Sequence, residues 1–154
     1  MTASMWPQVA AALRTVFDAA TTVDVFDGAP VTYAEIASGV AVGVDVASDD
    51  GTSGAIRQEW RDAGPAPAAH REETGEVVCT VWAQDGGDDL AAMRTAVFDI
   101  LDDCLDSLHT VTVLGLPEVL SVRGLADARP IQRRTQRGVV CEVAFRVTYY
   151  AVFN

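Results

Sequence analysis

The stretch from Gly138 to Phe153, GVVCEVAFRVTYYAVF, restricts the possible folds of this chain more than any other part of the sequence. From Val139 onward the odd positions are apolar or aromatic, whereas the even positions include Glu142 and Arg146. Alternation with a period of two predicts a β-strand with one buried face. This stretch is much longer than the usual strand of about five or six residues. It must therefore lie inside a sheet, and the rest of the chain has to supply its neighbours and a cover for its apolar face.

Other parts of the chain supply candidate neighbours for this strand. They are rich in valine or alternate apolar with polar residues, as half-buried strands do. The candidate strands are Val23–Phe26, Ile36–Val46, Glu76–Ala83 and Val119–Val122. Residues Thr110–Leu116 are expected to be extended, and Gly124–Gly138, which is rich in arginine, is expected to be a loop.

Two stretches have the three- and four-residue spacing of apolar positions that predicts an amphipathic helix. The first runs from Pro7 to about Ala20 and begins with proline, which suits a first helical turn. The second runs from Leu90 to about Ser107 and follows an Asp–Gly-rich break that supplies an N-cap. Each helix has one apolar stripe, so both are expected to cover the sheet.

Residues 47–75 differ in character from the rest of the chain. They combine glycine, proline and charged residues with only a brief apolar segment at Ile56–Trp60. Excursions longer than about 12 to 15 residues are uncommon in compact domains and are usually functional or disordered. We expect a long excursion on the surface that contains at most one short strand.

The order of these elements predicts an α+β fold. We expect a single domain over residues 1–154, with a mixed or antiparallel sheet of four to five strands and two helices packed on one face.

The charge composition excludes several functions. All eleven basic residues are arginine, so no lysine is present to bind phosphate in a Walker motif or to form a Schiff base. The formal net charge of −11 disfavours tight binding to nucleic acid, and DNA could at most be a passing cargo. No stretch reaches the roughly 18 consecutive apolar residues of a membrane helix, and no signal peptide is evident. We expect a soluble chain made in the cytoplasm and no contact with a membrane.

The residue types that most often carry chemistry do not form a recognisable site. The three cysteines, Cys79, Cys104 and Cys141, are far apart and lack the spacing of zinc ligands, so they are expected to be reduced and buried. His70 and His109 have no companions arranged as in a catalytic triad. We therefore expect no enzyme activity, no metal ion and no cofactor.

Two groups of opposite charge stand out. The acidic group lies on the second predicted helix and comprises Asp99, Asp102, Asp103 and Asp106. The basic group lies in the predicted C-terminal loop region and comprises Arg123, Arg129, Arg133, Arg134 and Arg137. Adjacent carboxylates on one helix do not surround Mg²⁺ or Ca²⁺ without further ligands. Since arginine pairs bidentately with carboxylates, the two groups predict a contact within the chain or between subunits; a solvated surface is the alternative.

Two tryptophans are also conspicuous. Trp82 lies on the face of its predicted strand opposite Cys79 and Val81, so it either packs under a second layer or lies at an interface. Core packing is the preferred interpretation for Trp82. Trp60 lies in the 47–75 excursion.

Several segments occur in a characteristic order. An amphipathic helix is followed by VFDGAP, VAVGVD, GEVVCTVWAQDGGDD running into LAAMRTAVFDILDDC, and finally TQRGVVCEVAFRVTYYA. Together they resemble the tail terminator family of long, non-contractile-tailed bacteriophages. The likeness covers nearly all of the chain, with residues 47–75 the least constrained.

The resemblance implies a structural virion protein, assembled in the host cytoplasm, that forms a ring, typically a hexamer. Such a ring sits on the last ring of the tail tube, ends its polymerisation and joins it to the head-side connector. The implied partners are other copies of the chain, the tail tube protein and the connector protein.

Closing such a ring requires two different complementary patches on each subunit. The acidic group, with Arg129, Arg133, Arg134 and Arg137, is the predicted subunit interface. The predicted contact with tube or connector comprises Asp49, Asp50, Arg57 and Trp60. The alternatives are an adaptor or head-closure protein, a soluble domain unrelated to phage that binds a protein or small ligand, and an uncharacterised enzyme.

Overall fold

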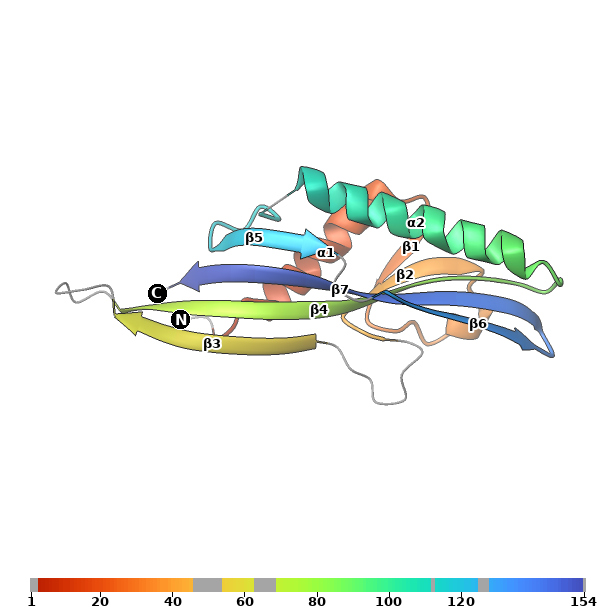
Figure 1. The fold of residues 1–154 in the computed structure, drawn as a ribbon, viewed down its shortest axis with the longest axis horizontal. Coiled ribbons are helices and arrows are strands. Elements are labelled where there is room, and N and C mark those ends of the chain that lie inside the picture. Colours follow the sequence, from red (N-terminus) through yellow and green to blue (C-terminus); the bar gives the residue numbers. More distant parts are fainter. Residues whose placement is uncertain (1–2, 46–53, 63–68, 112, 125–127, 154) are drawn as a thin grey trace.

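The computed structural model describes residues 3–45, 54–62, 69–111, 113–124 and 128–153. These residues form two α-helices, one short 3-10 helix and a seven-stranded sheet (Figure 1). In chain order the elements are α1 (Trp6–Ala20), β1 (Asp24–Asp27), η1 (Tyr33–Glu35), β2 (Ser38–Val42), β3 (Gly54–Asp62), β4 (Ala69–Asp85), α2 (Leu90–Thr110), β5 (Val119–Gly124), β6 (Arg129–Thr135) and β7 (Gly138–Phe153). The predicted α+β fold with a mixed sheet is confirmed, although the sheet has more strands than the four or five expected.

The two longest strands, β4 and β7, form the centre of the sheet. They pair antiparallel from Arg71 opposite Phe153 to Asp85 opposite Val139. Along the outer side of β4, β3 pairs with the first part and β2 with the second, and β1 lies parallel to β2. Along the outer side of β7, β6 and β5 pair with successive parts in the same way. The predicted C-terminal strand is thus confirmed as a central strand.

Both helices cover the same face of the sheet. The odd-numbered residues of β7 from Cys141 to Phe153 share one apolar cluster with Leu13 of α1 and Leu101 of α2. The rings of Phe17 and Phe145 make contact across it, with centroids 6.1 Å apart. α1 packs on β1, β2 and β4, whereas α2 lies over β4, β5 and β7 and runs along the sheet in Figure 1. The alternation of β7 therefore has the buried side that the sequence predicted.

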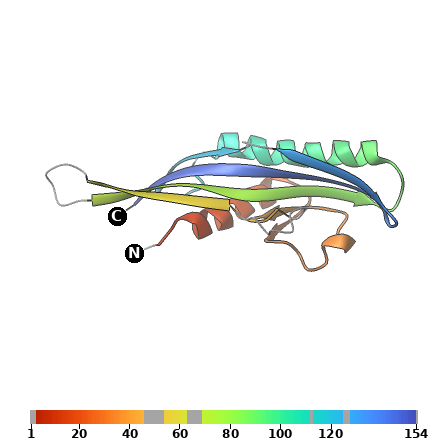
Figure 2. The ribbon, with the colours of Figure 1, turned by 60° about the horizontal axis from the view of Figure 1, so that its bottom comes forward.

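Two regions predicted to be irregular contain strands. Within the predicted Arg-rich loop, Arg129–Thr135 forms β6, an edge strand paired with β7. It has no buried residue, so no apolar alternation announces it, and an edge position tolerates its Pro130. Within the predicted excursion, β3 pairs along its whole length with the start of β4. This hairpin projects past both helices in Figure 2.

Smaller differences concern where elements end. β2 stops at Val42 because Gly43 has a positive φ of 82°, which ends regular pairing. α2 continues to Thr110, one turn beyond the predicted end, and the following residues turn at Leu114 and Gly115, where φ is positive. The prediction of an extended segment over Thr110–Leu116 is therefore wrong.

Trp82 is fully buried on the face of the sheet opposite the helices. Its indole N–H donates to the carbonyl of Ile36 at 3.0 Å, and its ring contacts those of Phe26 and Tyr33. It also covers Gly39, where a Cβ atom would lie only 2.7 Å from the indole. The predicted core packing of Trp82 is confirmed, and the ring holds the η1 segment against the sheet.

Glu73 is a fully buried carboxylate near the start of β4. Its Oε1 accepts hydrogen bonds from the Met5 backbone N–H at 2.8 Å and the Tyr149 hydroxyl at 2.6 Å. Ser4 Oγ donates to the same oxygen, and the Gln58 amide donates to Oε2. Burial by itself raises the pKa of this carboxyl, but the hydrogen bonds outweigh burial and lower the pKa below its usual value. One side chain thus ties β3, β7 and the residues before α1 together.

We expect Glu73→Gln to destabilise the fold more at neutral than at acidic pH. Because the folded-state pKa is depressed, the stabilisation by Glu73 is present above the unfolded value of about 4.3 and is lost as the pH falls through the folded value. Glutamine turns an amide donor toward groups that themselves donate, which costs about 1 to 3 kcal/mol. Urea unfolding at about pH 7 and pH 3 should show that the difference in free energy of unfolding between the native chain and the variant is smaller in acid. An equal difference in free energy of unfolding at both pH values would contradict this role. So would a similar pH dependence in the control variant Glu35→Gln, because Glu35 is exposed.

Candidate assembly surfaces

The acidic group forms an exposed stripe on the outer face of α2. All of its members, Asp99, Asp102, Asp103 and Asp106, are exposed. Their spacing of three and four residues places like charges beside one another on the helix, which is destabilising. Among the described residues none of these carboxylates has an ion-pair partner. The isolated chain therefore carries unfavourable electrostatic energy at this stripe. The stripe lies in the C-terminal half of the helix, toward the negative end of its dipole.

No ion pair joins the basic group to the acidic stripe in the described part of the chain. Arg129 pairs with buried Asp45, Arg133 with buried Glu142, and Arg134 with exposed Asp88. Arg137 is exposed at the turn between β6 and β7. Figure 1 shows this hairpin at the end of the molecule where α2 begins, whereas the stripe extends toward the other end of the helix. The arginines of the hairpin and the acidic stripe thus form separate surfaces.

Glu142 is the centre of a buried polar cluster that the sequence did not predict. It is 1% exposed, and its Oε1 accepts hydrogen bonds from Tyr33 Oη and Arg133 Nη2. Burial raises the pKa of the Tyr33 hydroxyl, and the bond to the carboxylate raises it further, so the phenol stays protonated and donates. Glu142 lies on the even face of β7, the mixed face of the predicted strand, and β6 and η1 cover it there. Arg133 is a structural partner of this carboxylate.

Beside this cluster lies an open groove of about 720 Å³. Tyr33 and Glu35 line it from η1, Asp85 from the end of β4, and Arg133 and Arg137 from the β6–β7 hairpin. Its walls carry both acidic and basic groups, so it has no single charge preference. Its position next to the arginines makes it continuous with the basic surface of the hairpin.

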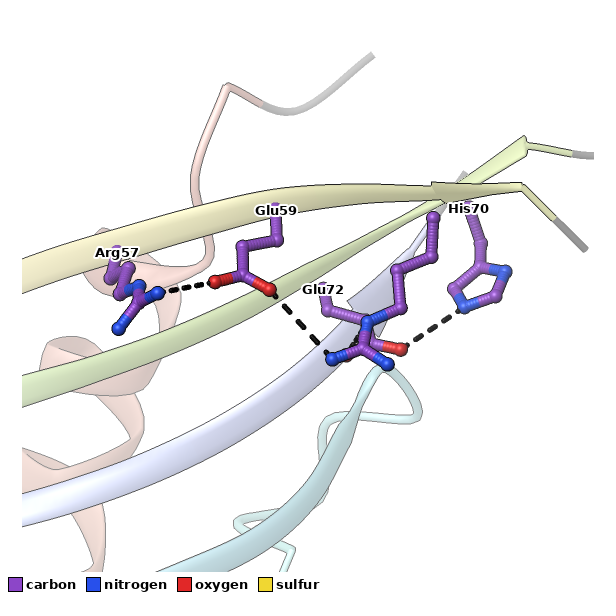
Figure 3. A network of polar contacts seen from close by, with 5 residues as sticks. Arg57, Glu59, His70 and Glu72 are labelled. Carbon is purple, nitrogen blue, oxygen red and sulfur yellow. Dashed lines mark hydrogen bonds and ion pairs between the residues drawn. The ribbon is translucent and has the colours of Figure 1, made fainter.

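The projecting β3–β4 hairpin carries a line of charges on one face (Figure 3). Arg57 and Arg61 both pair with Glu59 on β3, at 2.6 and 3.7 Å. Arg61 also pairs with Glu72 on β4 at 3.1 Å, and His70 contacts Glu72 at 3.2 Å. The charges alternate in sign along the line, so this face is locally neutral.

The other face of the hairpin carries two large exposed apolar side chains. Ile56 and Trp60 are 48% and 61% exposed, which is unusual for such large apolar side chains. The Arg71 guanidinium lies between the rings of Trp60 and Phe153, at 5.3 and 4.2 Å from their centroids. Two of the residues predicted to contact tube or connector, Arg57 and Trp60, are therefore on the projecting hairpin but on opposite faces. The other two, Asp49 and Asp50, lie outside the described residues.

Sequence reasoning found the charged groups but missed the buried carboxylates that hold the arginines. Asp45 and Glu142 lie in segments dominated by apolar residues, and an isolated acid in a strand was the available signal. An acid in a buried strand requires a hydrogen-bonding or cationic partner. Two residues of the basic group, Arg129 and Arg133, are these partners.

The residue types capable of chemistry are buried or dispersed. The cysteines are free and buried, as predicted, and burial raises the pKa of the Cys79 thiol to about 12. In the part of the chain that the structure describes, no cluster of three or more His, Cys, Asp or Glu side chains is placed to hold a metal ion. None of its helices is long and apolar enough to cross a membrane.

Comparison with known proteins gave matches only among solved structures. A scan against protein-family models found no match, and a search of the curated proteins found none either. Among solved structures, the chain is similar to a chain of "Virion of native gene transfer agent (GTA) particle". The two share 15% sequence identity with a TM-score of 0.32, over 97% of this chain and 93% of that one.

Proposed function

We propose that this chain is a structural virion protein that forms a ring of the tail-terminator type. In this ring, surfaces of opposite charge on neighbouring subunits meet. The observation that carries the proposal is the acidic stripe on α2, whose like charges repel one another and have no cationic partner in the described part of the chain. A basic surface on a neighbouring subunit would relieve that repulsion.

The β6–β7 hairpin supplies such a surface. Arg134 and Arg137 are exposed there, away from the stripe of their own chain. A contact between two different patches is heterologous, and it closes into a ring when the rotation between subunits allows. Together with the sequence resemblance to tail terminators, this supports a ring that caps the tail tube and meets the head-side connector. In this role the chain has no catalytic function.

The negative charge of the chain suits the passage of DNA through the ring. At a net charge of −11 the subunit repels phosphate, so a genome would slide through the lumen without being held. The projecting β3–β4 hairpin, with Arg57 and Trp60, remains available to the tube or connector. Contact of the hairpin with the tube or with the connector does not depend on the acidic stripe on α2.

We expect the triple substitution Asp102→Asn, Asp103→Asn and Asp106→Asn to weaken the ring while slightly stabilising the subunit. Removing like charges at three- and four-residue spacing relieves repulsion within α2, which should raise the melting temperature by about 1 to 3 °C. The same change removes the attraction for the neighbouring arginines. Native mass spectrometry and negative-stain imaging would show smaller assemblies, and thermal unfolding would report the subunit. If the stripe is an interface, the variant subunit becomes more stable while the ring becomes weaker. If the stripe is only a solvated helix face, the subunit becomes more stable and the ring is unchanged.

A matched control removes three negative charges elsewhere. Asp18, Asp24 and Asp27 are exposed and lie on α1 and β1, so their replacement by asparagine changes the net charge equally but should leave the ring intact. Raising the salt concentration from about 0.01 to 1 M should mimic the stripe variant, because surface pairs are screened. If the ring still forms in the variant with the three Asp→Asn substitutions and also at high salt, the proposed interface is wrong. A native chain that forms no ring, alone or with tail tubes, would sink the proposed function.

A further inference from the structure

The β3 strand has one side that no described strand occupies. It pairs with β4 through all of its residues, Gly54–Asp62, and with no other strand of the described sheet. An edge strand presents unpaired backbone N–H and C=O groups that can pair with another chain. In Figure 1 β3 forms the outer border of the sheet, and neither helix lies beyond it.

The sequence of β3 is complementary to itself about Gln58. On one face, Arg57 and Glu59 lie at equal distances from Gln58 and have opposite charges. On the other face, Ile56 and Trp60 lie at equal distances and are both exposed and apolar. A strand with this pattern matches a second copy of itself running antiparallel.

The geometry of antiparallel pairing restricts the register. Residues opposite one another must both point their backbone groups toward the partner or both away from it, so only every second register is possible. The register centred on Gln58 pairs Gly54 with Asp62 and thus uses the whole strand. It places each Arg57 opposite Glu59 of the second copy. The neighbouring allowed registers, centred on Arg57 or Glu59, place like charges directly opposite each other, which is destabilising.

We propose that β3 is a docking edge for a second copy of this chain, which pairs with it antiparallel about Gln58 and joins the two sheets. Ile56 of one copy then lies beside Trp60 of the other, an aromatic and β-branched pair of the kind that stabilises sheets. This contact is isologous and uses neither the α2 stripe nor the β6–β7 hairpin. It is therefore independent of the proposed ring interface, and it accounts for two large apolar side chains left exposed on a projecting strand.

Charge reversal tests the pairing in the Asp102→Asn, Asp103→Asn, Asp106→Asn background, where the ring is weakened and the dimer can be measured alone. Arg57→Glu or Glu59→Arg alone places like charges opposite each other at two symmetric positions and should raise the dimer Kd by about tenfold or more. The double variant Arg57→Glu and Glu59→Arg restores opposite charges and should restore the native Kd. Sedimentation equilibrium provides the measurement. The proposal would be overturned if the double variant dimerised as weakly as either single variant. It would also be overturned if the chain with the three Asp→Asn substitutions alone were monomeric at every concentration.

Disulfide trapping tests the register separately. A chain with Ile56→Cys mixed with a chain with Trp60→Cys should form a cross-link on mild oxidation, because these positions are opposite only in the register centred on Gln58. Each variant alone should cross-link much less, and the native cysteines are buried and do not compete. Equal cross-linking of the single variants, or none in the mixture, would exclude this register. A ring that forms normally while both tests fail would separate this proposal from the proposed function.

Discussion

Trp82→Ala is expected to lower the free energy of unfolding by about 3 to 5 kcal/mol, the usual range for deleting a buried large aromatic ring. Trp82 is fully buried, and its loss would leave a cavity between β2, β4 and η1. The substitution also removes the indole hydrogen bond to Ile36. For a chain of this size the loss corresponds to a fall in melting temperature of about 10 °C. Urea and thermal unfolding followed by circular dichroism would measure it.

The chain offers a control of the same residue type. Trp60 is 61% exposed, so Trp60→Ala should lower the free energy of unfolding by at most about 1 kcal/mol, the size of an exposed cation–π contact such as the one with Arg71. Trp82→Phe retains much of the ring volume and should fall between the two. If Trp82→Ala and Trp60→Ala unfolded at the same urea concentration, the face opposite the helices would not contain the packed layer described above.

Arg133→Glu is expected to destabilise the subunit by about 2 to 4 kcal/mol. Glu142 is a buried carboxylate, and removing its cationic partner leaves an uncompensated charge, for which about 3 to 5 kcal/mol is typical. The expected value is lower because the Arg133 side chain is 47% exposed and solvent screens part of the interaction. The new carboxylate adds repulsion at the same place.

Arg134→Glu separates assembly from folding. Arg134 is only one position away on β6, but its ion pair is with Asp88, whose side chain is 90% exposed. Exposed pairs contribute between about 0 and 1 kcal/mol, so this variant should fold normally and affect only the ring. Chemical unfolding at pH 8 and native mass spectrometry on the two variants would give the comparison. Equal stability of both variants would show that Arg133 does not hold Glu142.

The sequence was most informative where one face of an element is buried against the core. The period-two pattern of Gly138–Phe153 predicted β7 to within a residue, and the spacing of Leu90, Val97 and Leu101 predicted α2. In both cases the burial of apolar side chains sets the structure, and burial leaves a periodic trace in the sequence.

β6 leaves no such trace. Its residues are exposed, and it exists because its backbone bonds to β7. The same holds for most of β3, whose residues 55–61 are exposed and whose Gln58 bonds to buried Glu73. Tertiary pairing of this kind cannot be read from the strand's own residues.

The charged groups show a similar division. Their identities and signs were visible in the sequence, and the acidic stripe lies on one helical face as predicted. The internal partners of the arginines were not visible, because only the tertiary fold brings Asp45 and Glu142 beside β6. This is why Arg133, predicted as an interface residue, is a poor choice for testing the ring, whereas Arg134 and Arg137 are suitable.

The central pairing of β4 with β7 has a consequence for how the chain is made. The two strands are separated in sequence by α2, β5 and β6, so their pairing closes a long loop, which slows folding. On the ribosome, β4 emerges with its apolar residues long before β7 is synthesised. During that interval β2 and β3, which are already made, can cover one edge of β4. Shortening the β3–β4 hairpin should therefore lower the yield of soluble protein during synthesis more than it lowers the stability of the finished fold.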